Sequence, residues 1–227
     1  MLFLLNEELS FPPVDYADEN GLLAVGGDLD PQRLILAYQS GIFPWHDEPP
    51  MWYSPDPRMV LDLENYRPSK SLLRRIKKGE FEVKYDSAFG GVIRCCAALR
   101  DDTWISEDFI ESYTKLHEMG LAHSIETYQD GQLVGGLYGL SIGQAFFGES
   151  MFHTVTDASK VAFHYLVRQS QKWAFDLLDC QINNDHLLSL GGKDIPRDDY
   201  MDLLKEALSK PKKNESWKKY SPQDIYL

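Results

Sequence analysis

Two short polar stretches, about thirty residues apart, carry the side chains best suited to chemistry. In the second, Asp179-Cys180-Gln181, an expected strand turns Asp179 and Gln181 to one face and Cys180 to the other. In the first, GESMF, Glu149 lies at an expected strand end between apolar residues, so its carboxylate is partly desolvated unless it meets a cation or hydrogen-bond donors. Together the two stretches indicate a polar site that faces an apolar pocket and can hold an amino group.

The chemistry open to these side chains assigns each of them a role. An amide such as Gln181 is no base near neutral pH, but it can orient an amine or donate to a developing oxyanion, and Asp179 can fix its rotamer or accept a hydrogen bond from an incoming ammonium. The structural alternatives are that Asp179 caps a loop or pairs with an arginine, and that Glu149 faces water. Cys180 is expected to be a small core residue and not a nucleophile.

Apolar and aromatic residues supply candidates for the rest of the site. Two expected strands and the helix after them contribute residues that fit one bulky side chain, or an ordinary core. They are Leu137, Phe146, Phe163 and Leu166. Aromatic residues also lie outside periodic segments, at Trp45, Trp52, Tyr53 and Trp104. Such rings stack on unpaired bases or pack between domains, and for each residue taken singly we favour packing.

The composition of the 227 residues, 43% of them hydrophobic, suits one core or one core with a small satellite domain. No apolar run approaches the roughly 20 residues of a membrane span, and the opening MLFLLNEELSFPP lacks the features of a signal peptide, so we expect a cytoplasmic protein with no membrane partner. Three cysteines, two of them adjacent at Cys95 and Cys96, have neither a disulfide framework nor metal-ligand spacing. No bound metal is expected.

The net charge of −12 argues against a nucleic-acid partner unless the charges segregate. They do so in two basic clusters, at 70–78 and 210–219. A helix from Ser69 to Gly79 turns an apolar face (Leu72, Leu73 and Ile76) away from a cationic one. The cationic face carries Lys70, Arg74, Lys77 and Lys78. It is either a solvated helix surface or a stripe that follows phosphates, and the lack of an interleaved carboxylate supports the second interpretation.

The elements that would position these residues fall into two parts. A helix begins at Asp30-Pro31 and stops at Gly41. The prolines of FPWHDEPPMWYSPDPR then exclude a regular helix or a central strand, so we expect an irregular junction with a boundary near Asp56. Residues 1–56 would form a small N-terminal α/β domain and residues 57–227 a larger one.

The larger part shows an α+β order of elements. We expect helices at 107–119, capped by Ser106, at 158–174 and at 198–208, and strands at 123–128, 132–140, 144–148 and 177–182. Three consecutive antiparallel strands, a helix and a returning strand give a sheet with one face covered. The order is similar to that in the centre of the GNAT acetyltransferase fold.

Several motifs recur in fixed order along nearly the whole chain. They are NGLLAVGGDLDPQRLILAYQSGIFPWH, WYSPDPR, TWIS, HSIE, LVGGLYG, FFGESMF, ASK, LLDCQINNDHLLSLGG and IPR. In these motifs the chain resembles the leucyl/phenylalanyl-tRNA–protein transferase family. The resemblance implies a GNAT-like larger domain that transfers Leu or Phe, less readily Met, from aminoacyl-tRNA to proteins beginning with Arg or Lys. That transfer marks the acceptor for degradation by the N-end rule and uses no metal or acetyl-CoA.

The resemblance also implies roles for individual positions. Asp179 and Gln181 match the proposed catalytic pair, and Glu149 matches the acid at the mouth of the amino-acid pocket. The four apolar candidates match the lining of that pocket. Trp45 and Trp104 match aromatic residues associated with the site and the tRNA end, and the four cations match residues that bind the acceptor stem. His153-Thr154 departs from the Ser-Arg pair of the family.

The mechanism expected from these roles relies on positioning. The aminoacyl ester is already activated, so Gln181, held by Asp179, need only orient the attacking amine, with the proton leaving through the terminal ribose hydroxyls. Two alternatives remain. An acetyltransferase would carry a glycine-rich loop where this chain has HTVTDASK. A tRNA-binding module without catalysis would leave Asp179, Gln181 and Glu149 unexplained. We expect a monomer.

Overall fold

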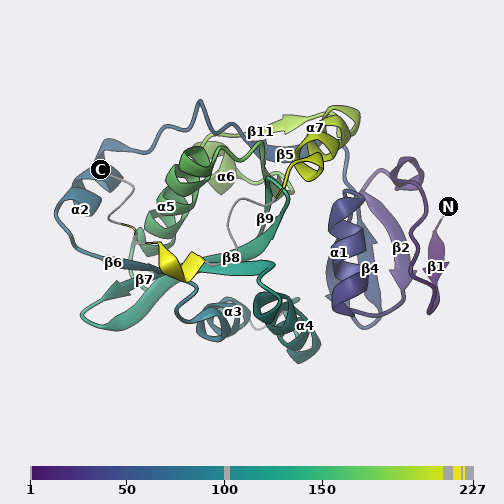
Figure 1. Ribbon diagram of the computed structural model, residues 1–227, viewed down its shortest axis with the longest axis horizontal. Helices are drawn as coiled ribbons and strands as arrows, with labels where there is room; N and C mark the ends of the chain where they lie inside the picture. Colours follow the sequence, from purple (N-terminus) through teal and green to yellow (C-terminus); the bar gives the residue numbers. More distant parts are fainter. Residues whose placement is uncertain (1, 100–102, 212–216, 221, 223–227) are drawn as a thin grey trace.

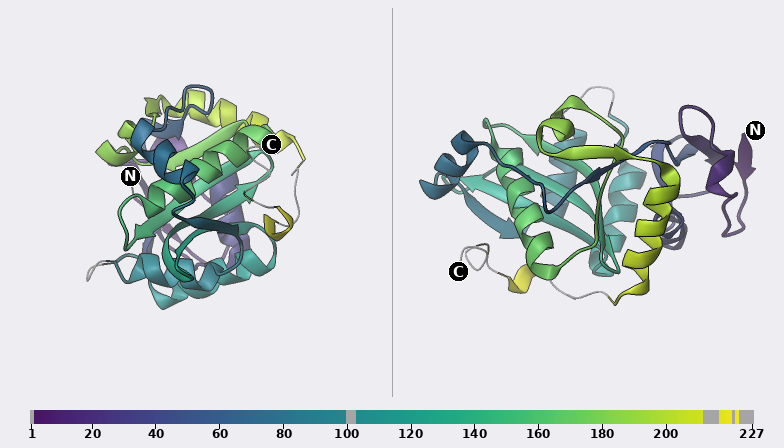
Figure 2. Two further views of the ribbon diagram at one scale, coloured as in Figure 1. Left: turned by 90° about the vertical axis from the view of Figure 1, so that its left-hand side faces the viewer. Right: turned by 90° about the horizontal axis from the view of Figure 1, so that it is seen from above.

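The computed structural model describes residues 2–99, 103–211, 217–220 and 222, which build a four-stranded and a seven-stranded β-sheet with flanking helices (Figure 1). The small sheet lies at one end of the molecule and helix α2 at the other, as the view from above also shows (Figure 2). The chain is a mixed α/β protein, in keeping with the expected order of elements.

The small sheet has the strand order β1-β2-β4-β3, and only its β1–β2 pair is parallel. Its elements are β1 (Phe3–Leu5), η1 (Val14–Tyr16), β2 (Leu22–Gly26), α1 (Pro31–Gln39), β3 (Phe43–Asp47) and β4 (Pro50–Tyr53). Helix α1 begins as predicted, because the Asp30 side chain accepts a hydrogen bond of 2.8 Å from the backbone N–H of Gln32.

The expectation of an irregular junction without a central strand is wrong, because β4 lies between β2 and β3. The prolines occupy the positions that a sheet tolerates: Pro50 is the first residue of its strand, and Pro44 lies on the edge strand β3. Trp52, in the middle of β4, is fully buried and donates its indole N–H to the Gly26 carbonyl at 2.9 Å.

The large sheet has the order β11-β5-β10-β9-β8-β7-β6, with one parallel pair, β9 and β10. The strands are β5 (Arg58–Leu61), β6 (Glu82–Tyr85), β7 (Ala122–Gln129), β8 (Gln132–Ile142), β9 (Ala145–His153), β10 (Leu177–Gln181) and β11 (Gly192–Ile195). The third strand of the predicted meander therefore continues to His153, and Glu149 lies inside it and not at its end.

Helices cover both faces of this sheet (Figure 1). They are α2 (Lys70–Lys77), α3 (Phe89–Ala97), α4 (Glu107–Glu118), α5 (Ala158–Trp173), α6 (Asp185–Ser189), α7 (Arg197–Ser209) and the short η2 (Trp217–Lys219). Helix α5 packs on the face that carries Leu137 and Phe146, whereas α3 and α4 pack on the face that carries Tyr138 and Phe147. The single covered face expected from the sequence is therefore wrong, because the unpredicted α3 and the predicted α4 together cover the second face.

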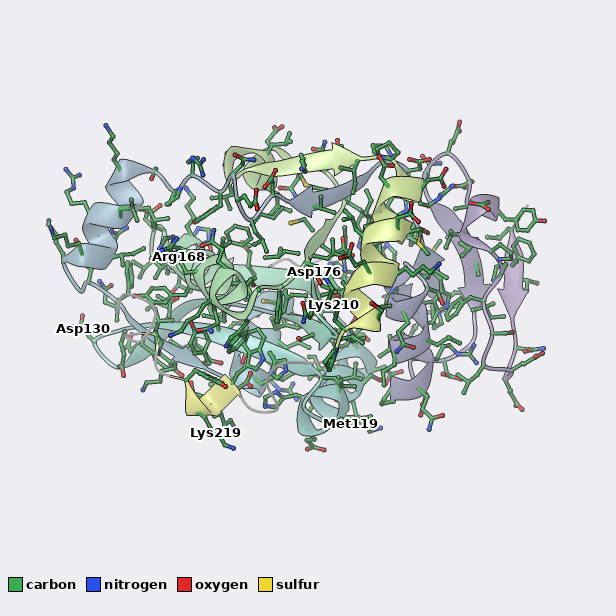
Figure 3. All side chains as sticks on the ribbon, turned by 45° about the horizontal axis from the view of Figure 1, so that its top comes forward. Met119, Asp130, Arg168, Asp176, Lys210 and Lys219 are labelled. Carbon is green, nitrogen blue, oxygen red and sulfur yellow. The ribbon has the colours of Figure 1, made fainter. Side chains whose placement is uncertain are left out.

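An ion pair connects the end of helix α7 to the large sheet. Lys210, at the end of α7, places its ammonium 2.8 Å from the Asp176 carboxylate, just before β10 (Figure 3). Within the described part of the chain, no helix combines the length and apolarity needed to cross a bilayer.

Close packing of α5 on the sheet makes Gly135 sensitive to substitution. A Cβ at Gly135 would lie 2.6 Å from the Ala158 Cβ and 2.8 Å from the Ala158 carbonyl carbon. We expect Gly135→Ala to lower the free energy of unfolding by about 1–3 kcal/mol in urea titrations. Gly90→Ala, in the exposed first turn of α3 with no heavy atom within 4 Å, serves as the control and should raise it by up to about 1 kcal/mol. Equal effects of the two changes would contradict this packing.

Candidate active site

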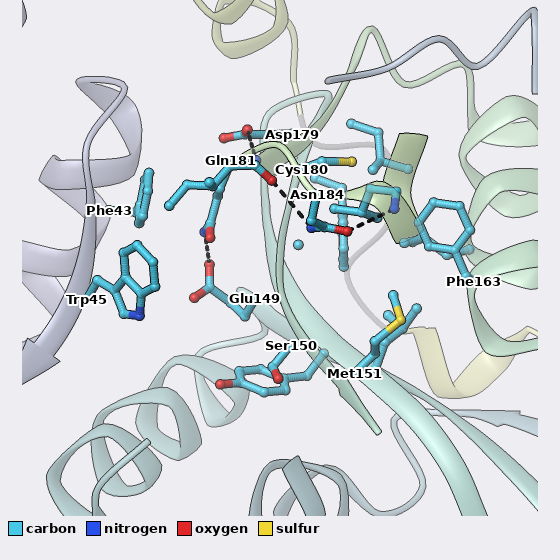
Figure 4. A pocket seen from close by; sticks show the side chains of 18 of the residues that line it. Phe43, Trp45, Glu149, Ser150, Met151, Phe163, Asp179, Cys180, Gln181 and Asn184 are labelled. Atoms are coloured by element: carbon cyan, nitrogen blue, oxygen red, sulfur yellow. Dashed lines mark hydrogen bonds between the residues drawn. The ribbon is translucent and has the colours of Figure 1, made fainter. Parts of the chain in front are cut away.

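A cavity of about 600 Å³ opens where the two sheets meet (Figure 4). Phe43 and Trp45, from the small sheet, lie on one side of it, Phe163 and Met151 on the other, and Glu149 and Gln181 between them. Every residue predicted as catalytic or substrate-binding lines this cavity.

One end of the cavity is apolar. The four predicted residues line it together with Met151, Leu178, Cys180 and Leu187. Cys180 points away from Asp179, as alternation predicts, and it packs against the core, as expected, while it also lines the cavity. Burial raises the pKa of its thiol well above the usual value, which keeps the group neutral.

Asp179 is fully buried and forms a two-pronged ion pair with Arg58. The Arg58 Nε and Nη2 atoms donate to its two carboxylate oxygens at 2.9 and 2.7 Å. The hydroxyl of Tyr200 donates to the same carboxylate at 2.9 Å. Burial alone would lower the pKa of Arg58, but the adjacent Asp179 carboxylate raises it above its ordinary value. The alternative that Asp179 pairs with an arginine is therefore what the structure contains.

Gln181 is held at both its backbone and its side chain. Its backbone N–H donates to Asp179 Oδ1 at 2.8 Å, and its side-chain Nε2 donates to Glu149 Oε1 at 2.8 Å. The register of β10 against β5 shifts between residues 179 and 181, and Gln181 has φ +65°, in the left-handed region that non-glycine residues rarely adopt. Asp179 thus fixes the backbone of Gln181, while Glu149 fixes its side-chain amide.

Glu149 accepts hydrogen bonds from two tyrosines as well. Tyr38, on α1, donates to Oε1 at 2.7 Å, and Tyr113, on α4, donates to Oε2 at 3.1 Å; the two hydroxyl oxygens are 2.5 Å apart. Burial raises the pKa of Glu149 to about 8; the tyrosine and Gln181 hydrogen bonds oppose this shift, and the nearby Asp179 carboxylate adds to it. The carboxyl group therefore exchanges protons near neutral pH.

The mouth of the cavity carries the two predicted tryptophans, both half-buried. Trp45 lies in β3, and not in a loop as expected, with its ring edge-on to Tyr53 at 5.7 Å between centroids. Trp104 packs edge-on against Phe109 at 5.2 Å. For Trp52, which is fully buried, the packing alternative is correct.

The predicted basic stripe lies on α2, at the end of the molecule opposite the small sheet (Figure 1). Lys70, Arg74, Lys77 and Lys78 are all exposed. Lys78 lies 3.8 Å from Glu80, so the stripe has one adjacent carboxylate. The expected apolar face is wrong at one position: Leu72 is buried, but Leu73 is 41% exposed.

The second basic cluster is described only in part, because residues 212–216 lie outside the described residues. Lys210 forms ion pairs with Asp176 and Glu206, and Lys218 and Lys219 are exposed on η2. At the departure from the family pattern, Thr154 donates its hydroxyl to the Val134 carbonyl at 3.3 Å, and Ser159 Oγ lies 3.3 Å from the Nδ1 of His153.

Sequence reasoning missed four residues that hold the polar end: Tyr38, Arg58, Tyr113 and Tyr200. The tyrosines occur at buried positions of amphipathic helices, where they look like core residues. A signal did exist for Arg58, a single cation directly before the apolar run Met59-Val60-Leu61 at the start of a strand. A buried cation needs an anionic partner, which Asp179 supplies.

Comparison with known proteins identifies the family. Residues 60–205 match the family model described as leucyl/phenylalanyl-tRNA protein transferase, and residues 27–56 match the model of its N-terminal domain. Leucyl/phenylalanyl-tRNA–protein transferases of Nitrosospira multiformis and Legionella pneumophila are each 50% identical to this chain. The first alignment covers 96% of this chain and 97% of the relative, and the second covers 92% and 96%.

Similarity to solved structures is weaker. The structure of L-PGS from Bacillus licheniformis aligns with 72% of this chain and 54% of that one, at 11% identity and a TM-score of 0.40. The sequence matches, in contrast, extend over almost the full length of both proteins at about half identity. The chain belongs to the leucyl/phenylalanyl-tRNA–protein transferase family.

Proposed function

We propose that this chain is an aminoacyltransferase that moves Leu or Phe, less readily Met, from aminoacyl-tRNA to the N-terminal Arg or Lys of acceptor proteins. The modified acceptors are thereby marked for degradation by the N-end rule. One observation carries the proposal: a single cavity has both an apolar end and a polar end. The apolar end is large enough for one bulky side chain, and at the polar end Gln181 is hydrogen-bonded to Glu149. An apolar lining with few polar groups selects a hydrophobic ligand and fixes its orientation.

The reaction needs little covalent chemistry from the protein. The acceptor α-amine attacks the ester carbonyl carbon, a C–N bond forms, and the C–O bond to the terminal ribose breaks. The proton lost by nitrogen reaches the ribose oxygen that leaves. Because the ester is already activated, no cofactor is needed to drive the transfer, and alignment of the two substrates supplies most of the rate.

In this mechanism Gln181 orients the amine and Glu149 takes up the proton of its ammonium form. Gln181 is suited to orientation because Asp179 fixes its backbone and Glu149 fixes its side-chain amide. Glu149 is suited to proton uptake because its pKa of about 8 lies close to that of an N-terminal amine. Asp179 then acts as a positioning residue, since its carboxylate holds the Gln181 backbone and is paired with Arg58.

The tRNA would approach from the mouth of the cavity. Trp45 and Trp104 are half-buried there, so each keeps ring surface on which the unpaired 3′-terminal base can stack. The stripe on α2 would hold the phosphates of the acceptor stem. Exposure of all four cations supports this role, although Lys78 also lies 3.8 Å from the Glu80 carboxylate.

We also propose a GNAT-like transfer domain at residues 57–227, preceded by a small domain at residues 1–56, in a cytoplasmic monomer. The change from one sheet to the other between β4, which ends at Tyr53, and β5, which begins at Arg58, supports this boundary.

The first test is transfer of radiolabelled leucine from charged tRNA to a peptide that begins with Arg, beside the same peptide beginning with Ala. We expect transfer to the Arg peptide only. Gln181→Ala should lower kcat by about 100-fold, because an orienting donor is removed, while Gln129→Ala, at the end of β7, should keep the full rate. Tight tRNA binding without any transfer would instead indicate a binding module.

A pH profile tests Glu149 as the proton acceptor. The deprotonated carboxylate is the active form, so kcat/KM should rise with pH and be half-maximal near pH 8. The Tyr113 hydrogen bond lowers the pKa of Glu149, so Tyr113→Phe should move this rise to higher pH and reduce the rate more at pH 7 than at pH 9. Tyr128→Phe, whose hydroxyl bonds Ser87, is the control. Glu149 would be excluded as the proton acceptor if the rise of kcat/KM occurred at the same pH in Tyr113→Phe as in the wild type. In that case the rise should shift only when the pKa of the acceptor amine is changed.

Salt-dependent tRNA binding tests the stripe. Replacing Lys70, Arg74, Lys77 and Lys78 with Ala should weaken binding and reduce the slope of log K against log salt by about 0.7–0.9 for each phosphate that the variant no longer neutralises. Transfer from a minimal aminoacyl-adenosine donor should not change. A matched control replaces Lys84, Arg94, Lys115 and Lys193, which are exposed but paired with local carboxylates. Equal decreases in affinity for both variants would show that only net charge matters.

A further inference from the structure

Trp217 lies directly behind the apolar wall of the cavity. It belongs to the short η2 helix, outside the segment 60–205 that matches the family model, yet its side chain is only 1% exposed. Its ring centroid lies 5.7 Å from that of Phe146, a residue that lines the cavity. A residue remote from the family's matched core thus supports the surface that a substrate side chain would meet.

Phe146 is confined from two directions. On the β8 side, a Cβ at Gly139 would lie 2.7 Å from two carbons of the Phe146 ring, so the ring already occupies the space that any larger residue would take. On the side away from the cavity, Trp217 fills the volume into which the ring could retreat. The position of this wall, and with it the depth of the cavity, therefore depends on Trp217.

Trp217 is itself held in place by rings from three elements. His123, on β7, stacks on it at 4.3 Å with an interplanar angle of 7°, and Trp173, at the end of α5, packs edge-on at 5.0 Å. Tyr85, on β6, packs edge-on at 6.2 Å. The His123 ring is fixed in turn, because its Nδ1 lies 2.8 Å from the buried Asp86 carboxylate.

We propose that Trp217 is a specificity-determining residue that acts through Phe146 to limit the depth of the amino-acid pocket. This inference rests on the proposed function, and it concerns which hydrophobic side chain the pocket takes. With Trp217 in place, the pocket discriminates against side chains longer than the depth that Phe146 allows. Removing volume behind Phe146 lets the ring retreat, so the pocket accepts an aromatic side chain more readily relative to leucine.

The test compares leucyl- and phenylalanyl-tRNA as donors for Trp217→Leu. We expect the ratio of kcat/KM for phenylalanine to that for leucine to rise by about 5-fold or more, since pocket volume differences of one or a few methylenes carry discrimination of about 10- to 200-fold. Trp217→Phe, which removes less volume and preserves folding better, should shift the ratio in the same direction by a smaller factor. Trp52→Leu, at a buried tryptophan of the small sheet, is the control for reduced stability and should leave the ratio unchanged.

A double-mutant cycle tests the route through Phe146. In a Phe146→Leu background the aromatic ring of the wall is absent, so Trp217→Leu should change the phenylalanine-to-leucine ratio of kcat/KM by less than about twofold. Additive effects of the two substitutions on this ratio would contradict the proposed route. A Trp217 variant that folds and lowers kcat/KM for both donors by the same factor would overturn the proposal, since that result indicates a purely structural role.

Binding of non-hydrolysable phenylalanyl- and leucyl-adenosine amides gives the same comparison without catalysis. If the wild-type protein binds these amides but transfers neither amino acid, the proposed function fails while the pocket assignment can still be read from the binding ratio. If the wild-type protein transfers leucine and Trp217→Phe leaves both the rate ratio and the binding ratio unchanged, the inference about Trp217 fails and the proposed function stands.

Discussion

The buried ion pair between Arg58 and Asp179 is the interaction on which the polar end of the cavity depends. Two charges removed from water are stable only when their geometry is good and their remaining polar atoms are bonded. Here the pair is bidentate, and the Tyr200 hydroxyl donates to the same carboxylate. Arg58 also donates to the Gly41 carbonyl and lies over the Phe43 ring at 4.6 Å. Because Gly41 and Phe43 belong to the N-terminal part of the chain, one guanidinium joins both sheets, and removing either charge would leave its partner buried and unpaired.

The ion pair also determines the conformation of Gln181. A non-glycine residue with positive φ costs about 1–3 kcal/mol, and it persists only where its surroundings stabilise it. The Asp179 carboxylate supplies that stabilisation through the Gln181 backbone N–H, and it can do so because Arg58 fixes its orientation. The side chain of Gln181 then reaches across the cavity to Glu149. The strained residue is thus held where, in the proposed mechanism, its amide orients the acceptor amine.

Elements whose ends are specified by neighbouring residues could be predicted from the sequence. Asp30 and Ser106 cap their helices as expected, because a capping side chain bonds within its own first turn. The residues named as catalytic or substrate-binding do line the cavity, but the four that hold its polar end, and the arrangement of the whole, were not predictable. Arg58 lies 121 residues from Asp179, and no local pattern encodes a partner at that distance. Alternation placed Cys180 opposite Asp179 correctly, but residues from both faces of β10 line the cavity, and that depends on how the surrounding elements pack, which is tertiary information.

The polar and apolar ends belong to one cavity, so what fills one end affects the solvent around the other. Burial is the main reason that the pKa of Glu149 is raised, and the apolar end is part of the surface that limits solvent around it. In the proposed reaction, a leucine or phenylalanine side chain that fills this end removes more water from the carboxylate. A drier site raises the affinity of Glu149 for a proton, and the hydrogen bonds from Tyr38 and Tyr113 oppose this rise. Binding of the aminoacyl group would thereby make the ionised Glu149 carboxylate a stronger base, while a smaller fraction of it is ionised at neutral pH. In the proposed mechanism the apolar wall therefore influences the protonation of Glu149 as well as the choice of amino acid.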